Sequence, residues 1–273
     1  MSRTFSLTVP ATAGGGNEDA MVIGDGVAVV VDGAGIPADL RAGCEHSVEW
    51  FARSVARVFH ALLVERSRSM VESLAETITR VRDSHATSCD LAAGSPSATV
   101  AAWRTTGRRL EYLVLCDASL ILVDRHGHGV ELTDRRLERI LETAAPRTGP
   151  AVTNTPSGDD VRAAQRPAVE ASRNQPDGFW CVHHDPVAAQ HALHGEVAIE
   201  DYAGVVACSD GGARAYDLLG THTLDQFAQQ SLGGALRSVA DSIRSAETQG
   251  AESLDTRGLK VHDDLTIAAL PFP

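Results

Sequence analysis

The sequence predicts an α+β protein in which sheets and helices are layered against one another. Short apolar runs that favour strands occur in the first third of the chain and return in its middle and last parts. Amphipathic patterns with helical spacing lie between them. Strands, then long helices, then more strands are typical of a layered α+β or α/β sandwich.

The first third of the chain contains the clearest elements. Strands are predicted at 5–9, 21–24 and 27–31, with Gly-rich turns between them. One apolar stripe with helical spacing runs from 38 to about 68, and a second helix follows from 69 to 87.

The rest of the chain repeats this alternation. Further strands are predicted at 98–103, 110–116, 120–124, 179–182, 205–208 and 265–270, and further helices at 224–232 and 236–247. Residues 145–178 are different, because Pro and Gly interrupt a polar run there. We interpret them as a loop or flap within a single domain, 1–273, with an interdomain linker as the alternative.

Composition limits the classes of partner. The formal charge of −12 argues against nucleic acid and against an anionic membrane surface. No apolar stretch has the length of a membrane-spanning helix, and the N-terminal residues lack a signal-peptide pattern. Cysteines at 44, 89, 116, 181 and 208 are widely separated and are expected to be reduced, mostly buried thiols. A cytoplasmic protein is expected, of undefined oligomeric state.

Acidic residues mark several turns, most of them where a strand-like run ends. They are Asn17-Glu18-Asp19, Asp32-Gly33, Ser209-Asp210-Gly211 and Asp263-Asp264. Carboxylates at strand ends can converge in the fold into a cage of oxygen ligands, which suits Mg²⁺ or Mn²⁺. Metal-dependent hydrolysis is therefore the first functional hypothesis.

The order of the motifs resembles a known family. The acidic motifs, together with Ser95-Pro96-Ser97-Ala98-Thr99 and Cys116-Asp117-Ala118-Ser119, are similar in order and spacing to those of the metal-dependent type 2C protein Ser/Thr phosphatases. This PPM-type resemblance extends from residue 5 to 270 and indicates a divergent bacterial member.

The resemblance implies a fold and an activity. The fold would contain two central antiparallel β-sheets flanked on both faces by α-helices, with a metal site at one edge. The activity would be hydrolysis of phosphoserine or phosphothreonine in phosphoprotein substrates. Two Mg²⁺ or Mn²⁺ ions about 3.5–4 Å apart would activate the attacking water.

The resemblance also implies roles for individual residues. Asp32 would bridge both ions, with the Gly33 carbonyl as a further ligand. Asp210 and Asp263 would complete one metal shell, so the catalytic set is Asp32, Asp210 and Asp263. Glu18 and Asp19 would act through bound water or as outer acceptors, and Asp117 would bind a third, weaker ion. The motif register favours Asp263 over Asp264 as the ligand.

The chain departs from the family pattern at three positions. Gly14 stands where members commonly carry a phosphate-binding Arg, and Arg3 is the only candidate to replace it in this N-terminal segment. Ser119 replaces a second Arg, and Asp264 replaces an Asn. Two alternatives therefore stay open: a catalytically weak protein that binds phosphoproteins or a regulatory partner, and a phosphatase of small phosphoesters.

Histidines offer two further hypotheses. The patch His183, His184, His191 and His194 could include a zinc-binding pair, although solvated surface imidazoles are the simpler interpretation. His262 could act as a general acid beside Asp263, or it could be a polar structural neighbour.

Overall fold

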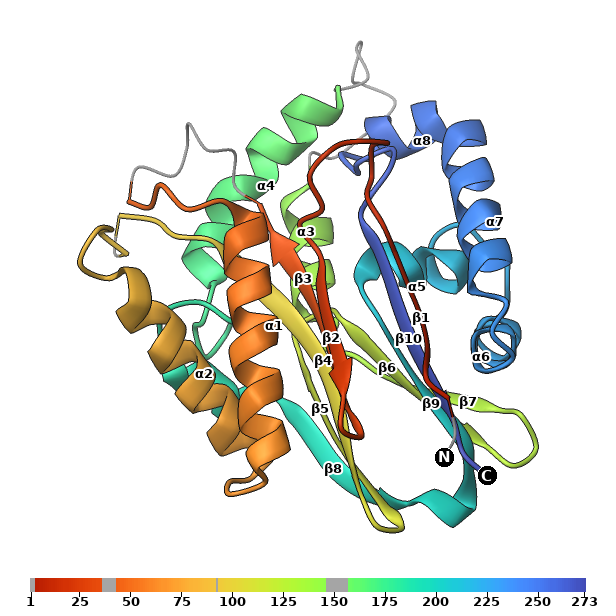
Figure 1. The fold of residues 1–273 in the computed structure, drawn as a ribbon. Coiled ribbons are helices and arrows are strands. Elements are labelled where there is room, and N and C mark those ends of the chain that lie inside the picture. The colour runs from red at the N-terminus through yellow and green to blue at the C-terminus, as the bar shows by residue number, and fades with distance from the viewer. Residues whose placement is uncertain (1–2, 36–42, 92, 146–156) are drawn as a thin grey trace.

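Two five-stranded antiparallel sheets stack against each other in the computed structural model, and helices cover their outer faces (Figure 1). The structure describes residues 3–35, 43–91, 93–145 and 157–273. The first sheet has the order β1-β10-β9-β6-β7 and the second β2-β3-β4-β5-β8. The predicted α+β sandwich with two antiparallel sheets is confirmed.

Both sheets take strands from both sides of residues 145–178. The first contains β1 (Phe5–Val9), β6 (Ser119–Asp124), β7 (Gly129–Leu132), β9 (Tyr202–Cys208) and β10 (Leu265–Pro271). The second contains β2 (Ala20–Gly24), β3 (Val27–Ala34), β4 (Ser97–Thr106), β5 (Arg109–Leu115) and β8 (Leu193–Ala198).

Strand β3 shows how the layers are built. Val27, Val29 and Val31 are buried in the core formed with the helices on the outer face. Ala28 and Val30 alternate with them and are buried in the core between the sheets. Successive side chains of a strand point to opposite faces, so one apolar run supplies two cores.

The helices form a separate cover for each sheet (Figure 1). Helices α1 (Val48–Glu65) and α2 (Met70–His85) pack on the second sheet, and α5 (Asp210–Asp217), α6 (Leu224–Leu232) and α7 (Leu236–Gln249) pack on the first. The remaining helices are α3 (Arg136–Ala144), α4 (Gly158–Ser172), α8 (Ala251–Thr256) and the 3₁₀ turns Pro186–His191 and Ile199–Asp201. Within the described residues, no helix combines the length and apolar character needed to cross a membrane.

The predicted start of the first long helix was wrong. Helix α1 begins at Val48 rather than at 38, because the Ser47 side chain accepts a hydrogen bond from the Trp50 amide and caps the helix there. Gly43, farther upstream, lies against the backbone of Asp90 and Gly94, which leaves no room for a side chain. The predicted helical residues 38–42 lie outside the described residues.

The prediction of a loop or flap at 145–178 was also wrong for most of the residues that the structure describes there. Residues Gly158–Ser172 form helix α4, whose N-terminus has a capping box between Ser157 and Asp160. Pro167 lies inside this helix, and Pro there had suggested a loop. Residues 146–156 lie outside the described part of the chain.

Other elements differ from the predictions. The predicted strand at 179–182 forms only isolated bridges, from Phe179 to Arg173 and from Val182 to Ala98. Strands β7 and β8 and helices α3, α5 and α8 had not been predicted.

The acidic motifs lie where the chain passes between the sheets or where strands end beside those crossings. The chain leaves β1 in the first sheet and reaches β2 in the second through Glu18 and Asp19. It returns from β5 to β6 through Asp117, after Cys116 adopts a left-handed φ of 66°. Ser119 pairs with Cys208, and Cys208 with Ile267, so β6, β9 and β10 meet this edge together.

Candidate metal centre

The carboxylates predicted as metal ligands converge at this edge. Asp32 lies near the end of β3, and its Oδ2 accepts a 3.4 Å hydrogen bond from the backbone amide of Asp210, the first residue of α5. Asp19 and Asp263 are also close enough to Asp32 for their charges to oppose its ionisation. Residues on both sheets therefore contribute to one acidic cluster.

Two glycines allow the backbones to approach. The Gly33 amide donates a 3.2 Å hydrogen bond to the Glu18 carbonyl, and a Cβ at Gly33 would lie 2.6 Å from that oxygen. Gly211 lies directly against the Asp264 carbonyl, which excludes any side chain there. Glycine is needed at both positions because a Cβ would separate the segments that carry the carboxylates.

Asp19 is the most unusual of these carboxylates. It is only 5% exposed, and neither carboxylate oxygen has a hydrogen-bond partner among the described residues. Burial raises its pKa to about 7, and repulsion from Asp210 and Asp264 adds to the shift, although the nearby Ser209 and Thr266 hydroxyls oppose it. A buried anion without partners is costly, and a bound cation would remove that cost.

The neighbouring carboxylates show the same effect. Desolvation, followed by repulsion from Asp210 and Asp19, holds the pKa of Asp32 well above its ordinary value. Desolvation and repulsion from Asp210 raise the pKa of Asp117 to about 7. Desolvation and repulsion from Asp263 raise the pKa of Asp210. Asp32, Asp117 and Asp210 remain partly exposed, so a ligand can reach them.

Asp263 and Asp264 have different contacts. The two oxygens of Asp264 accept 2.7 Å hydrogen bonds from the backbone amides of Ala11 and Glu18, and so fix the loop between β1 and β2. Asp263 instead makes salt bridges, to Arg214 at 2.8 Å and to Lys260 at 3.0 Å. Each oxygen of both carboxylates therefore has a partner, and the charge of Asp263 also opposes the ionisation of Asp32 and Asp210.

A buried ionic network connects Asp263 to helix α7. Glu247 of α7 is fully buried and accepts from Arg214 at 2.8 Å, from Arg244 at 2.7 Å and from His262 at 2.9 Å. Arg244 also donates to the Asp263 carbonyl at 2.7 Å. His262 is thus part of this network, which favours the structural reading of His262 over the general acid.

Lys260 is the single lysine of the 273 residues, and it lies at the acidic cluster. Its side chain is 56% exposed, and its Nζ lies 3.0 Å from Asp263 Oδ1 and 3.9 Å from Glu18 Oε2. Proximity to Asp263 outweighs desolvation and raises its pKa, so the ammonium stays charged. Its position in the sequence does not indicate this role, because the phosphate-binding cation was expected in the N-terminal segment. Arg3 precedes β1 at the end opposite to the cluster.

The donor set fits hard divalent cations. It consists of carboxylates and a backbone carbonyl, the oxygen ligands that Mg²⁺ and Mn²⁺ prefer. Within the described chain, these carboxylates do not bring three ligand atoms within 4.8 Å of one another. Three carboxylate oxygens that share one ion at about 2.1 Å would lie within about 4.2 Å of one another, so ion binding would draw these side chains closer together.

The raised pKa values predict a pH-dependent stability. Asp19 and Asp117 ionise near pH 7 in the folded protein, against an ordinary value of 3.8, so the folded state holds more protons between those values. Their contribution to stability therefore falls as pH rises from about 4 to 7. His183 acts in the opposite direction, because burial lowers its pKa to about 3.

The comparison of wild type with Asp19→Asn separates these effects. In EDTA, we expect the variant to gain thermal stability over the wild type as pH rises from 5 to 8, by several degrees. Saturating Mn²⁺ should remove that advantage by stabilising the wild type. An equal difference in melting temperature at both pH values would contradict the assignment of an unpaired, shifted Asp19.

Comparison with known proteins identifies the class of fold. The model of the family Protein phosphatase 2C matches residues 11–256, and the chain belongs to this family. A search of curated protein sequences gave no match.

Solved structures agree with the family. The serine/threonine phosphatase Stp1 of Staphylococcus aureus is 11% identical, with a TM-score of 0.56 over 100% of this chain and 96% of that one. The serine/threonine phosphatase PstP/Ppp of Mycobacterium tuberculosis is 14% identical, with a TM-score of 0.55 over 99% of this chain and 98% of that one. The catalytic domain of PstP in complex with two manganese ions is 14% identical, with a TM-score of 0.52 over 98% of this chain and 97% of that one. These likenesses define a PPM-type phosphatase fold.

Proposed function

We propose that the protein hydrolyses phosphoserine or phosphothreonine in protein substrates, using Mn²⁺ or Mg²⁺ bound at the acidic cluster. The observation that carries this proposal is the convergence of Asp19, Asp32 and Asp210 with raised pKa values at the edge between the sheets. Membership of the phosphatase 2C family and the two manganese ions of the PstP complex support it.

Each residue of the cluster would have its own role in metal binding or catalysis. Asp32, the Gly33 carbonyl, Asp210 and Asp263 would hold two ions, and Asp117 would hold a third. Bound divalent cations supply charge neutralisation for the phosphate and an activated water for attack on phosphorus. Glu18 and Asp19 would accept hydrogen bonds from water at the cluster. Water enters and an alcohol and inorganic phosphate leave, so no phosphoenzyme is needed.

Lys260 would bind the substrate phosphate in place of the Arg that is missing at Gly14. Its ammonium lies beside Asp263 and Glu18 and is more than half exposed, so a phosphate at the cluster would meet it. Arg214 is only 6% exposed at its side chain and is engaged with Glu247 and Asp263. Lys260 is therefore the better placed of the two cations that contact the Asp263 carboxylate.

Substitution of Lys260 tests this role. We expect Lys260→Met to raise the KM for a phosphothreonine peptide roughly tenfold or more, because a hydrogen bond to a charged group contributes about 1.5–3 kcal/mol. Lys260→Arg keeps the charge and should retain most of the affinity. An unchanged KM in Lys260→Met would exclude Lys260 from substrate binding.

The single lysine also permits a direct measurement of occupancy. An amine-reactive reagent can modify only Lys260 and the N-terminal amine. Inorganic phosphate in the presence of Mn²⁺ should slow modification at Lys260 but not at the N-terminus.

Two alternatives follow from particular contacts. Both Asp263 oxygens are engaged by Arg214 and Lys260, and Gly14 provides no guanidinium. These features suit a protein that binds phosphoproteins without efficient turnover. A phosphatase of small phosphoesters would use the same cluster.

One assay series separates the three. Purified protein should release phosphate from a phosphothreonine peptide with millimolar Mn²⁺ and lose that activity in excess EDTA. Peptide binding without release would support the binding protein, and release from metabolite phosphates but not from peptides would support the small-molecule enzyme. Either result would overturn the proposed protein phosphatase.

A further inference from the structure

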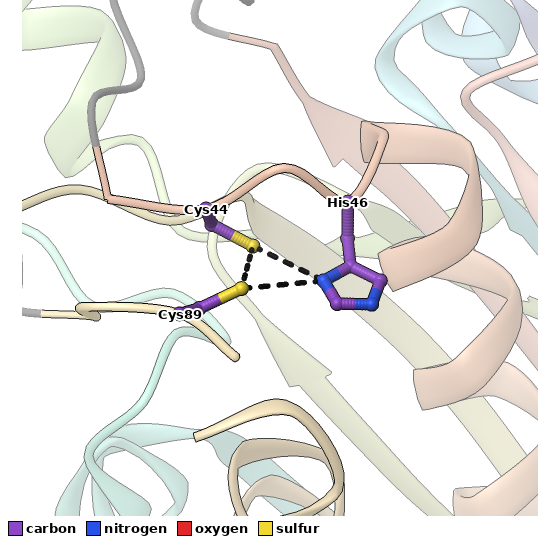
Figure 2. Close-up of side chains that lie close together, drawn as sticks. All are labelled: Cys44, His46 and Cys89. Atoms are coloured by element: carbon purple, nitrogen blue, oxygen red, sulfur yellow. Dashed lines mark hydrogen bonds between the residues drawn. The ribbon is translucent and has the colours of Figure 1, made fainter. Parts of the chain in front are cut away.

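Cys44, His46 and Cys89 form a second candidate ligand cluster, just before the start of α1 and just after the end of α2 (Figure 2). The two sulfurs lie 3.2 Å apart. The Nδ1 atom of His46 lies 3.5 Å from the Cys44 sulfur and 3.3 Å from the Cys89 sulfur. Of the described Cys, His, Asp and Glu residues, these are the set that brings three ligand atoms within 4.8 Å.

Two loops far apart in the sequence produce this cluster. Cys44 and His46 lie in the loop before α1, and Cys89 lies in the loop after α2. The first loop is held by the Ser47 cap of α1 and by the close approach of Gly43 to Asp90 and Gly94. The position of the three ligand atoms thus depends on the packing of the helix pair.

Aromatic neighbours orient His46. Its ring lies 4.1 Å from the Trp50 ring and 5.4 Å from the His85 ring, measured between centroids. His85 is buried, and its Nδ1 makes a 2.7 Å hydrogen bond with the Val81 carbonyl, which fixes that ring in turn. With Trp50 and His85 in place, His46 directs Nδ1 toward the sulfurs (Figure 2).

The spacing matches a tetrahedral zinc ion. Zn–S bonds of about 2.3 Å and Zn–N bonds of about 2.0–2.1 Å place two sulfurs about 3.8 Å apart and sulfur about 3.6 Å from nitrogen. The observed sulfur–sulfur distance of 3.2 Å needs to open by about 0.6 Å, and the sulfur–nitrogen distances of 3.3 and 3.5 Å by about 0.1–0.3 Å. Cys44 is 7% exposed, while His46 and Cys89 are partly exposed, so an ion can enter.

We propose that Cys44, His46 and Cys89 bind a zinc ion, with water or another donor at the fourth position. Two thiolates and an imidazole are soft and borderline ligands that select zinc over Mg²⁺ and Mn²⁺. This site is chemically distinct from the acidic cluster and does not depend on the phosphatase activity.

The zinc ion would join the start of α1 to the chain after α2. A ligand that binds only the folded protein stabilises it by mass action, so the melting temperature should rise with zinc concentration. The zinc pair suggested by the sequence, His191 and His194, lies elsewhere and does not share a helix face: His191 ends a 3₁₀ turn and stacks on Trp180 with centroids 3.6 Å apart, and His194 lies in β8.

Metal titration of the reduced full chain tests the proposal. The protein is first treated with EDTA, freed of EDTA and reduced with a phosphine. It should then bind one zinc ion tightly, and Co²⁺ should produce a thiolate charge-transfer band. Cys89→Ser and His46→Ala should lose the band and at least tenfold in zinc affinity. Cys181→Ala, which removes a buried thiol elsewhere, and Asp32→Asn, which alters the acidic cluster, should keep both.

Other results would overturn the proposal. One such result is that the reduced wild-type protein binds no zinc. This result counts against the site even if Cys44 and Cys89 later form a disulfide. Another is zinc binding of equal affinity in Cys89→Ser. If a variant does not fold, alkylation of the wild type decides the matter: zinc must protect Cys44 and Cys89, and equal labelling with and without zinc contradicts the site.

Discussion

Replacement of Asp32 by Asn should reduce phosphatase activity by about 10³-fold or more. The substitution preserves shape but removes the charge that is proposed to be shared between two cations. The same change should stabilise the metal-free protein near pH 8. Burial and the charges of Asp210 and Asp19 make the ionised form of Asp32 unfavourable, and Asn carries no charge. Phosphate release from a phosphothreonine peptide and thermal unfolding in EDTA measure the two effects.

The chain offers a matched control on the same hairpin. Asp25 is exposed at the opposite end of β3 and has a left-handed φ of 53°, a conformation that Asn tolerates well. Asp25→Asn should leave both activity and stability unchanged. Asp32→Asn activity within a few-fold of wild type would remove Asp32 from the reaction, and a loss of stability in the variant would indicate a structural role instead.

Replacement of Glu247 by Gln should destabilise the fold by about 3–5 kcal/mol. Glu247 is fully buried between two guanidinium groups, at 2.8 Å from Arg214 and 2.7 Å from Arg244. The amide keeps the shape but leaves the cations without their counter-charge, and an uncompensated buried charge is more costly than a lost surface pair. Urea denaturation followed by circular dichroism gives the free energy of unfolding.

Glu252 provides the comparison for this variant. It lies in α8 and is exposed, so Glu252→Gln should change the free energy of unfolding by less than about 0.5 kcal/mol. A change of similar size in both variants would show that the network around Glu247 does not stabilise the fold. Because Arg214 and Arg244 also hold Asp263, Glu247→Gln should in addition weaken Mn²⁺ binding.

Local patterns predicted the strands that build the sheets better than the segments between them. The apolar runs at 27–31 and 205–208 are buried on both faces, and such runs favour strands without reference to the rest of the fold. Helix α4 was missed because Pro167 lies inside it, although Ser157 and Asp160 give a capping signal. Strand β8 was missed because it pairs with β5, and such distant pairing overrides its local preference.

The site shows the same limit. The order of the acidic motifs suggested that Asp32 and Asp210 belong together, and the structure brings them into contact. Other features arise from contacts between distant segments, and local sequence patterns do not indicate them. They are the shifted pKa values of Asp32 and Asp210, the hydrogen bonds of Asp264 to backbone amides and the burial of Glu247. Lys260 could have been noticed from composition as the only lysine, but its place beside Asp263 and Glu18 required the fold. Cys44 and Cys89 show no recognised metal-binding spacing, because two helices separate them.

The pairing of β1 with β10 affects how the protein is made on the ribosome. Asp264 holds the Glu18 amide across 246 positions of sequence, and β10 lies between β1 and β9 in the sheet. A nascent chain that still lacks β10 has Glu18, Asp19 and Asp32 but cannot assemble the acidic cluster. Since non-local strand pairing is slow, the acidic cluster should become able to bind metal only after β10 has left the ribosomal tunnel.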